Sequence, residues 1–399
     1  MNGLLNIIGI VLILAMLYVI SYNRKSLNFK MLGKALGLQF VIAFILIKVP
    51  LGTKVLLAVS NFISAIIDCG KAGNEFVFGP LADTTGVGFV FAIQVLGNII
   101  FLSALVAMLY YVGILGFMVK WIGKAIGKVL GTSEVESFVS VANMFLGQTE
   151  SPILIGKYIG KMTKSEIMVV LVSGMGSMSV SILGGYAALG IPMECLLLAS
   201  ALVPVGGILV SKILLPETEE PQILSNVKMD NKGNNSNIID ALSEGAMTGV
   251  QIALAIGGTL IAMVSIVAAL NQGLAFINIS LEQIFSYIFA PISFFMGVNK
   301  EEIFVIAELL SSKLVLNEFV AFAKLGEIIS AMSPRTAVMT TISLCGFANF
   351  SSLGICVAGI SLLCPEKRQT LSRLVFKAMI GGVAVSLISA MIIGFVMSF

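Results

Sequence analysis

Two carboxylates lie inside otherwise apolar stretches of this chain, where an ionisable side chain is costly unless it is solvated or paired. Glu150 lies in Gly147–Ser151 (sequence GQTES), between two apolar half-segments. Glu318 lies in a second short interruption, Leu316–Phe319 (LNEF), in the other half of the chain. We therefore expect the chemistry of this protein to centre on these two side chains.

Neutral hydrogen-bonding side chains accompany both carboxylates, and no arginine lies among them. They are Gln148, Thr149, Asn317, Asn349 and Ser352. Phosphate or carboxylate ligands would favour an arginine fork. A carboxylate with neutral neighbours instead accepts hydrogen bonds from hydroxyl groups, so the pattern predicts an uncharged, hydroxyl-rich small molecule such as one that carries a sugar. Phe347 and Phe350 are suited either to stack on a flat ring or to fill the core.

A set of oxygen atoms near the first interruption is suited to hold a small hard cation such as sodium. It combines the Asn143 amide and the Ser177 hydroxyl with backbone carbonyls near Leu146 and Met178. Helix breaks commonly present free carbonyls in this way. The chain has no histidine, so proton coupling near neutral pH would need a carboxylate instead.

Lys313 and the cysteines are the remaining residues whose side chains could do chemistry. Lys313 lies five residues before Glu318 and is expected to pair with a carboxylate or to reach the outer interface. The five cysteines have no metal-ligand spacing and are interpreted as small buried apolar residues.

The elements that position these residues are predicted to be helices in a membrane. The chain has 399 residues, 58% hydrophobic and 11% charged, with a mean hydropathy of +1.04. No soluble domain of this length is so apolar. We predict an all-α polytopic membrane protein with eight transmembrane helices plus two re-entrant helical hairpins, since the apolar halves beside each interruption are too short to cross a bilayer. The expected spans are 4–21, 35–48, 87–117, 167–188, 195–215, 247–277, 336–355 and 374–399.

The order of these segments predicts an inverted-topology repeat. Residues 1–86 form N-terminal spans and an outer interfacial helix. Residues 87–215 form the first repeat with hairpin 133–159, and residues 247–399 form the second with hairpin 300–325. A cytoplasmic linker, 216–246, joins them, and its charges are expected to be solvated. Substrate then belongs at the repeat interface near the midplane. Short basic loops stay in the cytoplasm, which predicts that both termini lie outside.

Three motifs in the chain resemble signatures of the concentrative nucleoside transporter family. They are GQTES at 147–151, KLVLNEFVA at 313–321 and CGFANFSSLG at 345–354. The order and spacing of these motifs are also similar, over essentially the whole chain from the first basic loop onward. The resemblance is to the eight-span bacterial members. It implies a homotrimer in the bacterial plasma membrane that imports nucleosides with a coupled cation, through an elevator-like movement of the hairpin-bearing domain.

The resemblance also implies roles for individual residues. Those that would face or line the nucleobase are Gln148, Thr149, Glu150 and Ile182. Those that would hold or flank the ribose are Glu318, Asn349, Ser352 and Phe347. Those that would bind sodium, mostly through backbone carbonyls, are Asn143, Leu146, Ser177 and Met178.

Two other classes of function are left open by the residues themselves. One is an intramembrane enzyme that uses Glu150 and Glu318 as an acid/base pair. The absence of histidine, of a metal-ligand cluster and of a nucleophile beside a base argues against it. The other is a nucleoside-selective channel, which would equilibrate its substrate rather than concentrate it. No cofactor is expected beyond the coupling ion. Sodium is slightly favoured over the proton, and purine or pyrimidine preference is left open.

Overall fold

The computed structural model describes residues 2–222, 227 and 235–399, and the regular elements in this part are all helical. The α-helices of the first half, up to the linker, are α1 (Asn2–Val19), α2 (Phe29–Lys48), α3 (Pro50–Phe78), α4 (Phe91–Gln94), α5 (Leu96–Tyr111), α6 (Ile114–Leu130), α7 (Glu134–Ala142), α8 (Ser151–Leu154), α9 (Gly156–Ile159), α10 (Lys164–Gly176), α11 (Val180–Ala188) and α12 (Met193–Leu214). Those of the second half are α13 (Ile238–Leu274), α14 (Leu281–Phe295), α15 (Ile303–Val315), α16 (Glu318–Ile328), α17 (Pro334–Leu344), α18 (Phe350–Leu363) and α19 (Arg368–Val396).

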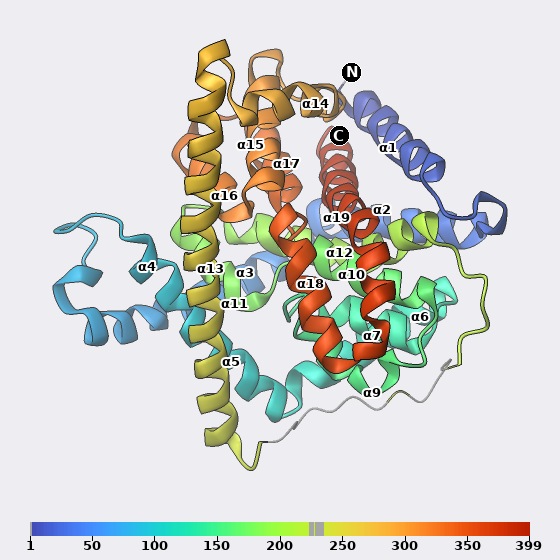
Figure 1. Ribbon diagram of the computed structural model, residues 1–399, viewed down its shortest axis with the longest axis horizontal. Helices are drawn as coiled ribbons and strands as arrows, with labels where there is room; N and C mark the ends of the chain where they lie inside the picture. Colours follow the sequence, from blue (N-terminus) through green and yellow to red (C-terminus); the bar gives the residue numbers. More distant parts are fainter. Residues whose placement is uncertain (1, 223–226, 228–234) are drawn as a thin grey trace.

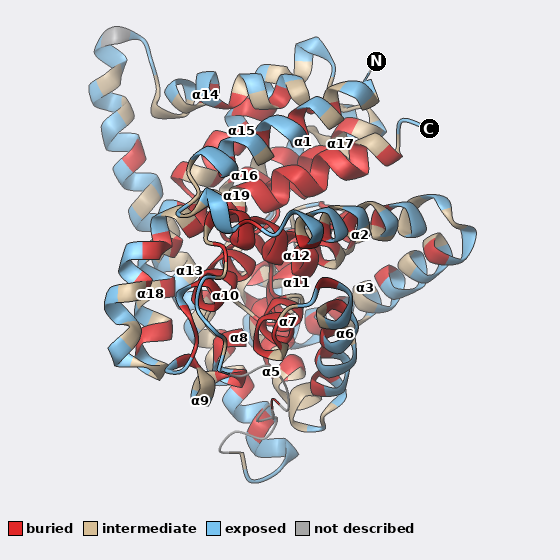
Figure 2. Ribbon diagram, turned by 90° about the vertical axis from the view of Figure 1, so that its right-hand side faces the viewer, coloured by how far each residue is buried: buried red, intermediate tan, exposed pale blue. Residues whose placement is uncertain are grey.

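Three helices form the centre of the molecule. Helices α10, α12 and α19 pack on one another and are buried along most of their length, as Figure 2 shows in red. The long helix α13 runs from the top to the bottom of the molecule in Figure 1 and packs along α5. Helices α2, α3, α13 and α18 keep much of their apolar surface exposed (Figure 2). Apolar surface on the outside of a chain this hydrophobic is the surface that lipid covers.

Eight helical segments in the described part are long and apolar enough to cross a membrane. All but one coincide with a span expected from the sequence. The exception is 50–82, which contains α3 and which we expected to lie at the outer interface. Its length and composition suit a span, and its placement relative to the membrane stays a prediction.

The segment 336–355, which we expected to form one span, is not a continuous helix. The segment forms two helices, α17 and α18, separated by the non-helical residues Cys345–Asn349. The Asn349 side chain accepts a hydrogen bond from the Ser352 amide at 2.9 Å and so caps a new helix at Phe350. The polar centre predicted for this segment is therefore a complete break in the helix.

Helix α13 begins at Ile238, inside the region 216–246 that we assigned to the linker and before the expected start of the span at residue 247. The Asn237 side chain accepts hydrogen bonds from the amides of Ile239 and Asp240 and caps the helix there. The two ends of the chain lie on the same side of the molecule (Figure 1), and the backbone at Gly3 lies against Ser398. Which face of a membrane this side occupies stays a prediction.

Candidate functional site

The first interruption forms a tight turn between α7 and α8. The Glu150 carboxylate accepts a hydrogen bond from the amide of Gly147 at 3.0 Å and closes the turn. The neighbouring Gln148 is 7% exposed. The Thr149 methyl packs against α18 at Gly359, where an added Cβ would lie only 2.6 Å from it. The turn that carries the GQTES motif is therefore inserted against the second half of the chain.

The second interruption separates α15 from α16 and places a carboxylate at the start of a helix. The Asn317 side chain accepts a hydrogen bond from the Val320 amide at 3.1 Å and caps α16. Glu318 is the first residue of this helix and is 4% exposed. An anionic group at a helix N-terminus is stabilised by the helix dipole. Local chemistry therefore fixes the direction in which this carboxylate points.

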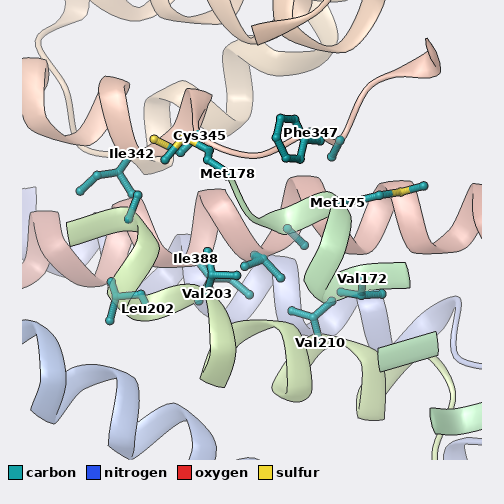
Figure 3. Packing of buried hydrophobic residues seen from close by; sticks show 14 of the residues in the cluster. Val172, Met175, Met178, Leu202, Val203, Val210, Ile342, Cys345, Phe347 and Ile388 are labelled. Carbon is teal, nitrogen blue, oxygen red and sulfur yellow. The ribbon is translucent and has the colours of Figure 1, made fainter. Parts of the chain in front are cut away.

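Two apolar segments of the fold are broken helices, α10–α11 and α17–α18, and their breaks lie against each other. Helix α10 ends at Gly176 and α11 begins at Val180, which leaves an extended segment comparable with the break between α17 and α18. The Phe347 amide donates to the Ser177 carbonyl at 3.2 Å. Gly346 has φ +100°, and a Cβ there would lie 2.8 Å from the carbonyl oxygen of Gly176. Only glycine fits this close approach, and Figure 3 shows Met178, Cys345 and Phe347 together at the upper edge of the apolar cluster.

Each interruption reaches across to the broken helix of the other half. The Gln148 amide donates to the Ser352 hydroxyl of α18 at 3.2 Å. The Glu318 carboxylate accepts hydrogen bonds from Tyr186 of α11 at 3.2 Å and from Asn349 at 3.1 Å. The structure thus brings the side chains predicted for the ribose, Glu318, Asn349 and Ser352, into one hydrogen-bonded cluster with Gln148. The cluster offers a carboxylate, amides and hydroxyls, which suit a neutral polyhydroxyl ligand.

Two members of this cluster were missed by reasoning from the sequence. Tyr186 is fully buried, and its ring packs on Phe319 and Phe322 with centroid distances of 4.8 and 4.6 Å. Ile182, predicted to line the base pocket, lies one helical turn from Tyr186 and is 5% exposed.

The second missed residue is Cys356. Its thiol donates to the Gln148 side-chain carbonyl at 3.2 Å, so it is more than the small apolar residue we expected. The interpretation as a buried residue is confirmed for Cys195, Cys345 and Cys356 and is wrong for Cys69, which is exposed.

The four residues predicted to bind a cation lie around the break between α10 and α11. Asn143 donates to Ser173 of α10 at 3.0 Å and accepts from Ser151 at 2.6 Å. The Val180 amide donates to the Phe145 carbonyl at 3.0 Å, which holds the first turn beside the break. Within the described residues, the carbonyls of Leu146 and Met178 accept no hydrogen bond. Two free buried carbonyls beside an amide and the Ser177 hydroxyl fit a small cation in the chemistry of their donors.

Lys313 does not pair with a carboxylate, and that expectation is wrong. Its ammonium donates to the backbone carbonyls of Ser343 and Cys345 and to the hydroxyl of Ser386. The side chain is 2% exposed, so it does not reach the outer interface either. No ion pair to Glu318 is found in the part of the chain that the structure describes.

A buried ion pair lies at the base of the first hairpin. Glu136 of α7 pairs with Lys212 of α12, whose ammonium also donates to Ser165 of α10 at 2.8 Å. Glu217, a linker residue that we expected to be solvated, accepts from Thr163 at 2.8 Å and pairs with Lys212 at 3.5 Å. These contacts tie α7, α10 and α12 together.

The protein has broken apolar helices around a cluster of polar side chains. This arrangement is typical of membrane transporters that bind their substrate at discontinuous helices. Comparison with known proteins agrees with this class. Models of the Na+ dependent nucleoside transporter N-terminus and C-terminus match residues 8–81 and 195–394, and a model for nucleoside recognition matches 92–193.

Relatives match over nearly the whole chain. The uncharacterized transporter YutK of Bacillus subtilis is 39% identical, with 99% of both chains covered. The nucleoside permease NupC of Helicobacter pylori is 33% identical, over 98% of this chain and 97% of its own. The structure of CNTnw in an inward-facing substrate-bound state gives a TM-score of 0.94 at 35% identity, covering 100% of this chain and 99% of that one.

The chain belongs to the concentrative nucleoside transporter family. This confirms the resemblance found in the three motifs, and it makes the chain a multi-pass membrane protein of an Na+-dependent transporter family. Its relatives are transporters and not enzymes, so Glu150 and Glu318 are not an acid/base pair of an intramembrane enzyme.

Proposed function

We propose that this protein imports nucleosides by cation symport, with sodium favoured over the proton as the coupling ion. The observation that carries the proposal is the environment of Glu318. Its carboxylate is buried, receives hydrogen bonds only from neutral groups in the described part of the chain, and lies where both broken helices and both interruptions converge. Such a carboxylate is suited to accept hydrogen bonds from two neighbouring ribose hydroxyls. The substrate-bound structure of CNTnw and the permease NupC support the substrate class.

The proposed site divides between sugar and base. Glu318, Asn349 and Ser352 bind the ribose, and Phe347 flanks it. Gln148, Thr149 and Glu150 face the base, and Ile182 lines its pocket. The hydrogen bond from Gln148 to Ser352 supports a single site made of both groups, because it joins them at one point. The coupling ion binds Asn143, Ser177 and the carbonyls of Leu146 and Met178.

The proposed transport mechanism requires an inverted repeat. We infer that α7–α9 and α15–α16 are re-entrant hairpins that enter the membrane from opposite faces. The reciprocal contacts support this, since each hairpin touches the broken helix of the opposite half. The hairpin-bearing domain then moves as an elevator within a homotrimer in the bacterial plasma membrane, with both termini outside. Matches to CNTnw in inward-facing and outward-facing states, each with a TM-score of 0.94, support alternating access.

Uptake into proteoliposomes tests the function and its coupling. Uridine and adenosine uptake is measured under an imposed inward sodium gradient and, separately, under an imposed proton gradient. We expect accumulation above the external concentration with sodium alone. Accumulation with protons alone would move the coupling to Glu150 or Glu318. Equilibration without accumulation under both gradients would overturn symport and favour the channel.

A variant of Tyr186 tests how the carboxylate is positioned. Tyr186→Phe removes one donor to Glu318 and leaves the ring that packs on Phe319 and Phe322. A hydrogen bond to a charged group contributes about 1.5–3 kcal/mol, so we expect the KM for uridine to rise about tenfold. The ratio of uptake rates for uridine and 2′-deoxyuridine should fall as well. An unchanged KM would show that Tyr186 is a packing residue only.

A further inference from the structure

The ammonium of Lys313 has three oxygen partners and no water-exposed surface of consequence. It donates to the carbonyl oxygens of Ser343 at 3.0 Å and Cys345 at 2.8 Å, and to the hydroxyl of Ser386 on α19 at 3.1 Å. An ammonium has three donors, and all three are used here. The side chain is 2% exposed. In the described part of the chain, every hydrogen-bond partner of this ammonium is a neutral oxygen.

The Lys313 ammonium lies at the C-terminal end of a broken helix, where a transporter of this class can bind a coupling cation. Ser343 lies in the last turn of α17, and Cys345 is the residue at which that helix breaks. The C-terminal end of a broken helix carries a partial negative charge and free carbonyls, and such ends bind coupling cations in transporters. In this protein the carbonyls at the end of α17 are already occupied by a cation that belongs to the chain.

Among the residues that the structure describes, no cationic side chain is seen to donate to the corresponding end in the first half. There α7 lies beside the end of α10, as α15 lies beside the end of α17. Asn143 supplies a neutral amide to Ser173 where Lys313 supplies its ammonium to the second break. The carbonyls of Leu146 and Met178 accept no hydrogen bond within the described residues. At each break a side chain from the segment before the interruption donates to the broken helix, as a neutral amide from Asn143 at the first break and as an ammonium from Lys313 at the second.

We propose that the Lys313 ammonium is a built-in cation that fills, in the second repeat, the position that the coupling ion takes in the first. This inference rests on the proposed symport function and on the inverted repeat. It has two consequences. A single coupling ion, bound at Asn143 and Ser177, moves with each nucleoside. Lys313 is also a positioning residue, because it fixes the segment 345–349 from which Phe347 and Asn349 project.

The wild-type protein tests the first consequence without any substitution. Net charge and nucleoside flux are measured together in proteoliposomes held at a set membrane potential. We expect about one positive charge per uridine, and a Hill coefficient of about 1 for the coupling ion. About two charges per uridine would overturn the proposal. Absence of uridine transport would instead be a failure of the proposed function, and the charge ratio would then have no meaning.

Substitutions of Lys313 test the second consequence by equilibrium binding of uridine to purified protein. Lys313→Ala removes the charge and opens space, and Lys313→Met removes the charge and fills the space. Ionic strength is held constant with choline chloride. We expect both variants to bind uridine about tenfold more weakly at a sodium concentration that suffices for the wild type. Added sodium or methylammonium should restore binding to Lys313→Ala and not to Lys313→Met.

The matched control is Lys324→Met on the other arm of the same hairpin. Lys324 is 41% exposed in its side chain and pairs with Glu308. The Lys324→Met protein should bind uridine as the wild type does, and its affinity should not change when methylammonium is added. Wild-type affinity in Lys313→Met would overturn the proposal. The proposal would also be overturned if Lys313→Ala is monodisperse, loses uridine binding and regains none with any small cation. Lys313 would then have a structural role only.

Discussion

We expect the replacement of Glu318 by glutamine to lower nucleoside uptake by about a hundredfold or more and to leave the protein folded. The carboxylate already accepts from Tyr186 and Asn349, and its remaining acceptor capacity is what the ribose hydroxyls would use. Glutamine has a single acceptor oxygen and directs an NH2 group toward the same donors. Two lost charge-assisted hydrogen bonds, at about 1.5–3 kcal/mol each, lower uptake by about a hundredfold or more. Initial rates of uridine uptake in proteoliposomes measure this.

The control for this variant is Glu327→Gln. Glu327 lies on the same helix, α16, and is exposed. It should transport uridine at the wild-type rate. Thermal unfolding of both variants in detergent shows whether they are folded. Uptake by Glu318→Gln at the wild-type rate would remove Glu318 from the site and with it the main argument for a ribose ligand.

The sequence located both interruptions because the residues that break the helices are visible in it. Asn317 and Asn349 cap the helices that follow them, and Gly147 begins the turn closed by Glu150. Composition located most of the apolar spans for a similar reason, since burial in lipid is a property of long runs of residues. The break in 336–355 was underestimated, because a polar centre in a span predicts polarity but not how far the backbone unwinds.

The hydrogen-bond partners of individual buried side chains could not be predicted from the sequence. Tyr186 and Glu318 are 132 residues apart, and each lies in a run whose periodicity fits simple packing. Cys356 and Gln148 are 208 residues apart. Lys313 shows a more general limit. We sought a carboxylate for it, whereas its partners include backbone carbonyls, which every residue carries and which no sequence pattern distinguishes.

Loss of the buried ion pair between Lys212 and Glu136 should have the largest effect on stability. Both side chains are nearly inaccessible, at 8% and 3% exposure, and Glu136 also takes part in the capping box of α7 with Ser133. Lys212→Met leaves an uncompensated buried carboxylate, which costs about 3–5 kcal/mol. We expect a correspondingly large fall in the free energy of unfolding, measured by denaturant titration in detergent micelles.

A double variant separates the lost charge balance from lost packing. Lys212→Met combined with Glu136→Gln removes both charges of the buried pair and leaves only the less buried Glu217 without its partner, so more than half of the lost stability should return. Lys324→Met serves as the control, because its pair with Glu308 is exposed and contributes about 0–1 kcal/mol. If Lys212→Met unfolds no more readily than this control, the pair does not stabilise the fold. If stability falls as expected, the ion pair anchors α7 to α12 and, through the contact of Lys212 with Ser165, to α10.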